Sequence, residues 1–357
     1  MKTPDFFHRR SPGFAMSWAL APLHAASWLY GAGASLHARA YSGGRRGRRL
    51  ACGVVSVGSP MVGGTGKTPL AAHVASLLKA DGYRVALASR GYGVARGEEV
   101  VVISDGRSLK APLEASGDEP RVLAAHAPGV PVLVARDRGL AGLKAIEEFG
   151  TEILVLDDGL AHHRLCRDLE IVTFDGQMGL GNGHVLPRGP LRERLKGLAR
   201  ADAVIVTDGP MPEEDQARTR THASSAQWFE ALRRVSCLRS LSTGESIPVD
   251  DLAGRSVGLL CGIAYPASFE SMVSKLGAQV LSRRFLPDHH RYGKADVARL
   301  SETAPLWVVT EKDAVKLDPA WLGDCEVWAL EIEIDPAPGF AEWLSASVRA
   351  RVPARKD

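Results

Sequence analysis

A glycine-rich loop between an apolar strand and a helix limits the fold of this chain more than any other feature. Gly53–Val57 is a short apolar run, and the loop Val-Gly-Gly-Thr-Gly-Lys-Thr occupies residues 62–68. From about Pro69 to Leu78, apolar side chains recur at helical spacing and give one buried stripe. Glycines let backbone N–H groups converge on phosphate oxygens at a helix start, so this order predicts a phosphate-binding loop.

The residues of the loop suggest specific contacts with a nucleotide. Lys67 would reach the β and γ phosphates, and the Thr68 hydroxyl would hold Mg²⁺. Met61 stands where the strict P-loop pattern has its first glycine, so the loop is a variant of that pattern. The residues whose backbone N–H groups would face the phosphates are Gly63, Gly64, Thr65 and Gly66.

A second apolar run, Ile153–Leu156, ends in Asp157 and Asp158. Such a run suits a buried strand whose carboxyl end faces the phosphate site, where one aspartate would contact Mg²⁺ directly or through water. The sequence does not decide which aspartate touches the metal first. The alternative is that Asp158 and Gly159 form a simple turn and Asp157 is a capping residue.

The N-terminal region combines a diluted apolar stretch with a basic cluster. Residues 14–41 predict a helix, but histidines, serines, glycines and Pro22 make it a poor membrane span. We expect this helix to lie at a membrane surface, anchored by the arginine run at residues 45–49. A helix packed on its own domain is the alternative, and a true span is the least favoured.

Apolar runs alternate with helical stretches along the rest of the chain, which predicts an α/β fold of P-loop NTPase type with helices on both faces of a mostly parallel sheet. A linker-like segment near residues 208–216 separates a smaller second α/β lobe. The expected domains are a membrane-associating segment at 1–49, a P-loop core at 50–215 and the smaller lobe at 216–357. The further expected strands are Arg84–Ala88, Val132–Ala135, Glu170–Phe174, Ala203–Val206, Ser256–Cys261 and Leu306–Val309.

Composition excludes several classes of protein. The 357 residues are 45% hydrophobic and 24% charged, with a net charge of only +3, so the chain is not a polycation built for nucleic acid. Five scattered cysteines form no Cys-x-x-Cys pair, which argues against a disulfide framework or a zinc site. No obligate protein partner is evident.

Two clusters could take a proton from an alcohol acceptor. Asp118 and Glu119 begin a predicted helix, where acidic residues are also common as simple helix-start residues. His289 and His290 lie in a Pro-Asp-His-His-Arg-Tyr segment, and such a pair is more often a surface or core feature.

The chain resembles the tetraacyldisaccharide 4′-kinase (LpxK) family of lipid A synthesis from the apolar N-terminus to at least Leu317. The motifs that carry the resemblance are the loop at 62–69, Ser-Arg-Gly-Tyr-Gly at 89–93, Gly-Asp-Glu-Pro at 117–120, Asp-Asp-Gly-Leu at 157–160, Leu-Pro-Arg-Gly-Pro-Leu-Arg-Glu at 186–193, the segment 285–292 and Thr-Glu-Lys-Asp-Ala-Val-Lys-Leu at 310–317.

The resemblance implies ATP and Mg²⁺ as cofactors, a lipid disaccharide substrate, an anionic membrane surface as partner, and a place at the cytoplasmic face of the bacterial inner membrane. It implies that Asp118 accepts the hydroxyl proton together with His289, and that Asp157 and Asp158 form a Walker B-like pair. Glu119 is a further metal or positioning candidate, and His290 remains an alternative to His289.

Arg188 and Arg192 are candidates for the substrate's 1-phosphate, with exposed loop arginines as the alternative. Ser59, Ala161 and Tyr265 depart from the family pattern without removing a phosphate, metal or base candidate. Two other interpretations stay open: a soluble P-loop kinase or ligase acting on a small metabolite, and a membrane-associated nucleotide switch without an acceptor.

Overall fold

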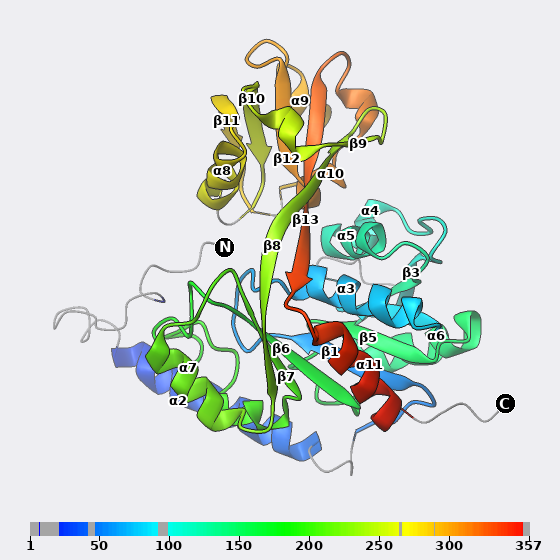
Figure 1. Ribbon diagram of the computed structural model, residues 1–357, viewed down its shortest axis with the longest axis vertical. Coiled ribbons are helices and arrows are strands. Elements are labelled where there is room, and N and C mark those ends of the chain that lie inside the picture. Colours follow the sequence, from blue (N-terminus) through cyan, green and yellow to red (C-terminus); the bar gives the residue numbers. More distant parts are fainter. Residues whose placement is uncertain are drawn as a thin grey trace. The chain divides into compact units, whose positions relative to one another are not determined.

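The computed structural model describes residues 7, 21–41, 47–91, 99–263, 266–288 and 290–352. The chain forms two compact units (Figure 1). The P-loop unit comprises the chain up to Arg233 together with Ile334–Asp357. The second unit comprises Arg234–Glu333, so it is an insertion in the sequence of the P-loop unit.

The P-loop unit is built on one mostly parallel sheet in the order β8-β7-β6-β1-β5-β2-β4-β3. Only β3 runs antiparallel to its neighbour. The six strands expected here from the sequence, including the run that ends in Asp157, are all present within two residues. The strands are β1 (Gly53–Gly58), β2 (Val85–Ser89), β3 (Val100–Ser104), β4 (Val132–Ala135), β5 (Ile153–Asp157), β6 (Leu169–Asp175), β7 (Ala203–Thr207) and β8 (Gln227–Ser240).

Helices cover both faces of this sheet, because its strands are apolar on both sides and need cover on each. On one face α3 and α11 pack with the buried side chains of Leu70, Leu344 and Val348 (Figure 1). The opposite face is covered partly by α6. The helices of this unit are α3 (Lys67–Ala80), α4 (Leu113–Ser116), α5 (Asp118–His126), α6 (Arg138–Phe149), η2 (Leu195–Arg200), α7 (Glu213–His222) and α11 (Phe340–Arg351).

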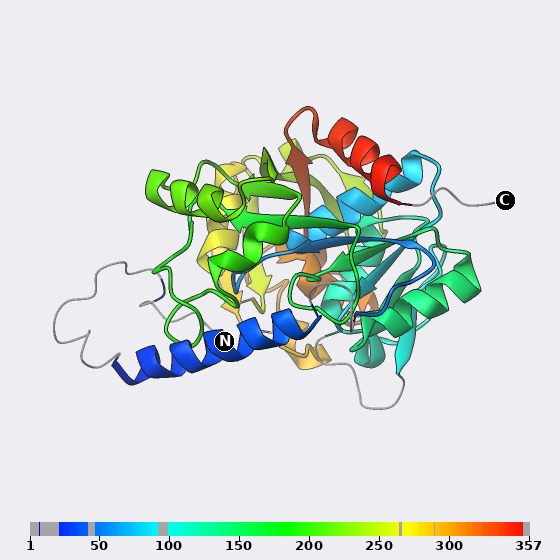
Figure 2. The same cartoon turned by 90° about the horizontal axis from the view of Figure 1, so that it is seen from below.

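The N-terminal helix α2 (Ala21–Tyr41) belongs to the P-loop unit and runs along it (Figure 2). The Ser27 hydroxyl donates to the carbonyl oxygen of Val185 at 2.8 Å and accepts from the N–H of Arg188 at 3.0 Å. Within the described ranges, no helix is both long and apolar enough to cross a bilayer. The two bonds of Ser27 place one side of α2 against its own unit. The exposed large apolar side chains of α2 are Trp28, Leu29, Tyr30 and Leu36.

In the second unit the strand order is β11-β10-β12-β13-β8, with β9 paired to β8. Its core contains the buried Trp307 and Trp328. Its elements are β9 (Ser246–Ile247), η3 (Val249–Leu252), β10 (Ser256–Cys261), α8 (Pro266–Lys275), β11 (Gln279–Phe285), α9 (Lys294–Val297), β12 (Leu306–Thr310), α10 (Glu311–Ala314), η4 (Pro319–Trp321) and β13 (Glu326–Pro336).

The division into units differs from the one expected at residues 215 and 216. Where a linker was expected, α7 begins at Glu213, and Asp215 is only 2% exposed. The Asp215 carboxylate accepts from the N–H of Leu180 at 2.9 Å, which fixes this segment to the P-loop unit. The helix α11, which lies within the range 216–357 expected for the smaller lobe, also belongs to the P-loop unit, because its apolar face fills that unit's core.

Candidate functional site

The glycine-rich loop lies between the end of β1 and the start of α3, as the sequence predicted. Gly63 has φ 110° and Gly66 has φ 77°, backbone conformations that strain any residue with a side chain. Gly66 is the N-cap of α3 and makes no side-chain capping bond. The first N–H groups of α3 have no helical acceptor, so the loop and helix start form an anion-binding site.

Lys67 is held inside the loop. Its ammonium donates to the carbonyl oxygen of Gly63 at 3.2 Å. Burial lowers the pKa of Lys67, and the nearby carboxylates of Asp158, Asp157 and Glu119 oppose that shift. Three acidic groups from two segments, the end of β5 and the start of α5, thus act on the Lys67 ammonium.

Thr68 and Asp157 face one another across the first turn of α3. The Thr68 hydroxyl lies 3.5 and 3.4 Å from the two carboxylate oxygens of Asp157. Asp157 is 2% exposed, and the hydroxyl of Ser89, at the end of β2, lies 3.5 Å from it. The parallel pairing of β1 and β5 sets Val57 beside Asp157, which brings the second strand's tip to the loop.

Asp158 adopts a left-handed backbone conformation, with φ 54°. Its two carboxylate oxygens accept from Nη1 of Arg192 at 2.8 and 2.7 Å, and its carbonyl oxygen accepts from Arg138 at 3.4 Å. Burial alone would raise the pKa of Asp158, but Lys67 and Arg192 outweigh it and lower that pKa. Arg192, expected as a phosphate contact, thus pairs with Asp158, whereas Arg188 contacts His24 of α2 at 2.5 Å.

Asp118 and Glu119 form the first turn of α5. The N-cap is Gly117, with φ 74°, so neither acidic residue occupies the capping position. The N–H of Glu119 donates to Oδ1 of Asp118 at 3.1 Å. The negative charge of Glu119 is one of those that oppose the lowering of the Lys67 pKa.

The two candidate histidines follow β11 in the sequence of the second unit. His289 lies outside the described residues. Its neighbour His290 is described, and Nε2 of His290 lies 3.1 Å from Oδ2 of Asp296. His290 is thus engaged within the second unit.

The donor atoms near the loop suit Mg²⁺. In the described part of the chain, no group of three or more His, Cys, Asp or Glu residues is placed to hold a metal. Mg²⁺ is usually held by one or two carboxylates, with phosphate and water oxygens completing its coordination. The hydroxyl of Thr68 and the carboxylate of Asp157 are an oxygen donor pair of that kind.

One contact to the loop was missed from the sequence. The Arg233 guanidinium, from β8, donates through Nη1 to the carbonyl oxygen of Gly64 at 2.8 Å. The carboxylates of Asp175 and Asp208 hold the same guanidinium, the former at 2.8 Å. Asp175 is the last residue of β6, and Asp208 directly follows β7. An aspartate at the end of an apolar strand was therefore the sequence signal that could have indicated this contact.

This chain is similar in sequence and in fold to known proteins of one family. Residues 16–349 match the family model described as tetraacyldisaccharide-1-P 4′-kinase, LpxK. A protein named tetraacyldisaccharide 4′-kinase from Syntrophus aciditrophicus is 42% identical over 291 residues, covering 77% of this chain and 78% of that protein. A relative of the same name from Anaeromyxobacter dehalogenans is 41% identical over 322 residues, covering 87% of this chain and 85% of the relative.

A solved structure is similar over nearly the whole chain. It is that of LpxK from Aquifex aeolicus, described as a complex with ATP, and it is 30% identical with a TM-score of 0.76. The match covers 95% of this chain and 100% of that one. Because the family model matches residues 16–349 of the 357 residues, this chain belongs to the tetraacyldisaccharide-1-P 4′-kinase family.

Proposed function

We propose that this protein is an ATP-dependent kinase that transfers the γ-phosphoryl group to the 4′-hydroxyl of a tetraacyldisaccharide 1-phosphate, a lipid A precursor. The family and the names of the relatives support the reaction and the acceptor. The observation that carries the proposal is the Thr68 hydroxyl facing the Asp157 carboxylate beside Lys67. This pair stands at the anion-binding start of α3, as phosphoryl transfer requires.

The phosphate loop would hold the nucleotide. Backbone N–H groups of Gly63, Gly64 and Gly66 would face the phosphates, whereas that of Thr65 donates to the Gly63 carbonyl oxygen at 3.2 Å in this structure. Lys67 would neutralise the charge that develops on the transferring group. Thr68 and Asp157 would hold Mg²⁺, with Glu119 as a further ligand or positioning residue. Bound Mg²⁺ would supply positive charge to the phosphate oxygens during transfer. The negative charge of Asp158 also acts on the Lys67 ammonium.

Asp118 would act on the acceptor. Its carboxylate takes the proton of the 4′-hydroxyl as the sugar oxygen forms a bond to the γ-phosphorus. The bond between that phosphorus and the β,γ-bridging oxygen breaks, and ADP leaves with the electron pair. His289 acts with Asp118 in this proton transfer, so that neither group needs an extreme pKa.

The acyl chains of the acceptor require the enzyme to work where the lipid is. The α2 helix exposes Trp28, Leu29 and Leu36, of which Trp28 and Leu29 are each 66% exposed. Aromatic and aliphatic side chains of this kind favour the boundary between headgroups and acyl chains. The helix would therefore hold the protein peripherally at an anionic membrane, at the cytoplasmic face where ATP is available.

The test is transfer of radiolabelled phosphate from ATP to the purified lipid disaccharide. The Asp118→Asn variant should lose about 10²- to 10⁴-fold in kcat, because it cannot accept the proton, while Mg²⁺–ATP analogue binding persists. Unchanged turnover in this variant would remove Asp118 from proton transfer. ATP hydrolysis that ignores the lipid would instead favour a nucleotide switch, and transfer to a small soluble alcohol would favour the metabolite kinase.

A further inference from the structure

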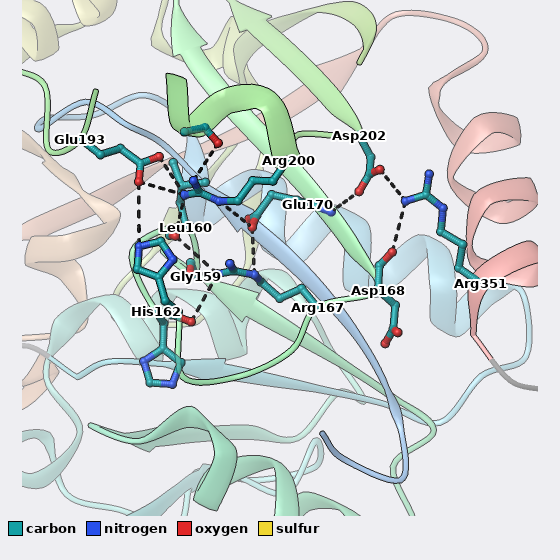
Figure 3. Close-up of polar contacts among 12 residues, drawn as sticks. Gly159, Leu160, His162, Arg167, Asp168, Glu170, Glu193, Arg200, Asp202 and Arg351 are labelled. Atoms are coloured by element: carbon teal, nitrogen blue, oxygen red, sulfur yellow. Dashed lines mark hydrogen bonds and ion pairs between the residues drawn. The ribbon is translucent and has the colours of Figure 1, made fainter. Parts of the chain in front are cut away.

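A buried ionic cluster lies behind the aspartate pair, in the same unit as the phosphate loop (Figure 3). Glu170, on β6, is only 3% exposed. One of its carboxylate oxygens lies 2.9 Å from Nε of Arg167 and 3.6 Å from Nε of Arg200. Nothing in the proposed transfer uses these three side chains, although burying three charged groups is costly for the fold.

Both arginines also donate to carbonyl oxygens of the chain that directly follows Asp158. Nη1 of Arg167 donates to the carbonyl oxygens of Gly159, Leu160 and His162, at 3.1, 3.4 and 3.3 Å. Nη2 of Arg200 donates to the Leu160 carbonyl oxygen at 3.0 Å. We call residues 158–163 the aspartate loop, and both guanidinium groups bind its main chain (Figure 3).

A fourth side chain, that of Glu193, completes the cluster. Nη2 of Arg200 also donates to both carboxylate oxygens of Glu193, at 2.8 and 3.0 Å. Glu193 directly follows Arg192, the residue that binds the Asp158 carboxylate. Two arginines and two glutamates thus balance in charge, and the cluster joins the aspartate loop to the segment that supplies the partner of Asp158.

The aspartate loop needs such support because its conformation is strained. A left-handed non-glycine residue such as Asp158, with φ 54°, costs about 1–3 kcal/mol and persists only where the surroundings enforce it. Its neighbour Gly159 has no room for a side chain, since an added Cβ would lie 2.4 Å from Oγ of Ser56. Relaxation to an ordinary backbone conformation would turn the Asp158 carboxylate away from Arg192 and Lys67.

Burial makes the arginines and the glutamate depend on each other. It raises the pKa of Glu170, and the positive charges of Arg167 and Arg200 oppose that rise. Removing one partner leaves the others charged, buried and uncompensated. The cluster is therefore rigid, which suits a device that fixes a strained loop.

We propose that Arg167 and Arg200, fixed by Glu170, are positioning residues that hold the aspartate loop so that Asp158 faces Lys67 and Arg192. This role rests on the proposed function, because it acts through Asp158. A displacement of about 1 Å at a reacting group can cost on the order of 10²-fold in rate, so main-chain contacts this far from the phosphates still affect transfer.

The direct test is Arg167→Lys, which keeps the charge beside Glu170 but loses the fork that donates to three carbonyl groups. We expect kcat to fall about 10- to 100-fold, with KM for ATP changed less than about threefold. The matched control is Arg84→Lys. Arg84 also pairs with a glutamate, Glu152, and donates to a main-chain carbonyl, that of Gly150, but at the opposite end of β5 from the aspartate loop. Arg84→Lys should leave kcat unchanged.

A double-mutant cycle separates positioning from general destabilisation. On an Asp158→Asn background, Arg167→Lys should cost little further activity, because the group it positions is already lost. Full additivity of the two losses would overturn the proposal, as would an unchanged kcat in folded Arg167→Lys protein. Arg200→Lys provides the same comparison if Arg167→Lys fails to fold.

Hydrogen exchange gives a readout that does not depend on catalysis. Amides of residues 158–163 should exchange at least about tenfold faster in Arg167→Lys than in the wild type, and no faster in Arg84→Lys. Unchanged exchange would overturn the positioning role even if the wild type proved to be an active kinase. If exchange is faster in Arg167→Lys but the wild type phosphorylates no lipid acceptor, the proposed function is wrong and the role of the cluster in holding the aspartate loop stands.

Discussion

Arg233 shows how a single side chain can prepare the phosphate loop from outside it. Its guanidinium bridges the carbonyl oxygen of Gly64 and the carboxylates of Asp175 and Asp208. Asp208 itself has φ 60°, a strained conformation stabilised by this contact and by its acceptance of the Arg233 N–H at 3.1 Å. With the Gly64 carbonyl directed at Arg233, the peptide units of the loop keep a fixed orientation.

Arg233→Lys should therefore weaken the binding of a Mg²⁺–ATP analogue. A lysine has one charged nitrogen and cannot bridge the Gly64 carbonyl and two carboxylates with the same geometry. We expect Kd to rise about tenfold, which corresponds to about 1.4 kcal/mol, with kcat at saturating ATP changed less. Isothermal titration calorimetry measures the Kd.

Arg239→Lys is the matched control for that variant. Arg239 lies on the same strand, pairs with Glu331 and donates to the carbonyl oxygen of Gly244 at 3.1 Å, all within the second unit. It should bind the analogue like the wild type. Equal affinities in all three proteins would mean that the loop keeps its shape without Arg233.

At this scale, sequence reasoning predicted residues that belong to contiguous motifs. Lys67, Thr68 and Asp157 come together because one loop and one strand end must meet in a parallel α/β sheet. The partners Arg192 and Arg233 were not predicted in their roles, because each comes from a distant segment and an isolated arginine carries no local pattern. The role of Arg192 in particular reverses the expected phosphate contact: it neutralises a carboxylate.

The helix α2 combines two surfaces that the sequence had presented as alternatives. Ser27 faces the unit and binds its main chain, whereas Trp28, Leu29 and Leu36 lie on the exposed side. A helix with polar contacts to its own domain can thus still present an apolar face outward. Periodicity alone did not separate the two, because small residues such as glycine and alanine occupy both sides of this helix.

We predict that the triple variant Trp28→Ser, Leu29→Ser, Leu36→Ser loses membrane binding without unfolding. Each large apolar side chain contributes about 1.5–3 kcal/mol when it is buried from water, and none of the three is buried in the protein. Sedimentation with vesicles of anionic phospholipid should show at least a tenfold lower bound fraction of the variant at limiting lipid, with an unchanged thermal midpoint.

Leu143→Ser is the control for a single exposed leucine elsewhere. Leu143 is 48% exposed on α6, in the same unit. It should bind vesicles like the wild type. If the triple variant and the control bind equally well, the apolar side of α2 does not contact the bilayer.

Strand prediction was accurate for the central strands of the P-loop unit but missed β3, β8, β11 and β13, and β3 was missed although Val100–Ile103 is a continuous apolar run. The central strands of the P-loop unit are buried on both faces, so each reads as an uninterrupted apolar run. By contrast, β8 and β11 alternate exposed and partly buried residues and contain several arginines, so neither was predicted. The segment expected as a linker was rich in proline and acidic residues, which also begin helices such as α7.

In the whole molecule, the sequence of the P-loop unit is interrupted by the second unit. The chain leaves the P-loop unit after Arg233 and returns at Ile334, and α11 then completes the P-loop core. Sequence order suggested two consecutive lobes, because no local feature of residues 334–352 reports which distant core they fill. Each unit nevertheless has its own apolar core, with Leu70 in the first and Leu260 in the second, both fully buried.

Separate cores predict separate responses to nucleotide. Because the phosphate loop lies wholly in the P-loop unit, a Mg²⁺–ATP analogue at about 100 times its Kd should stabilise that unit by about 2.7 kcal/mol. Leu70→Ala and Leu260→Ala each remove a buried leucine and should destabilise their own unit by about 2–5 kcal/mol. Calorimetry of the full chain should then show two unfolding transitions. Leu70→Ala should lower the midpoint temperature of the transition whose midpoint the analogue raises, and Leu260→Ala should lower the midpoint of the other. A single transition that both variants and the analogue move together would show that the two cores unfold as one cooperative structure.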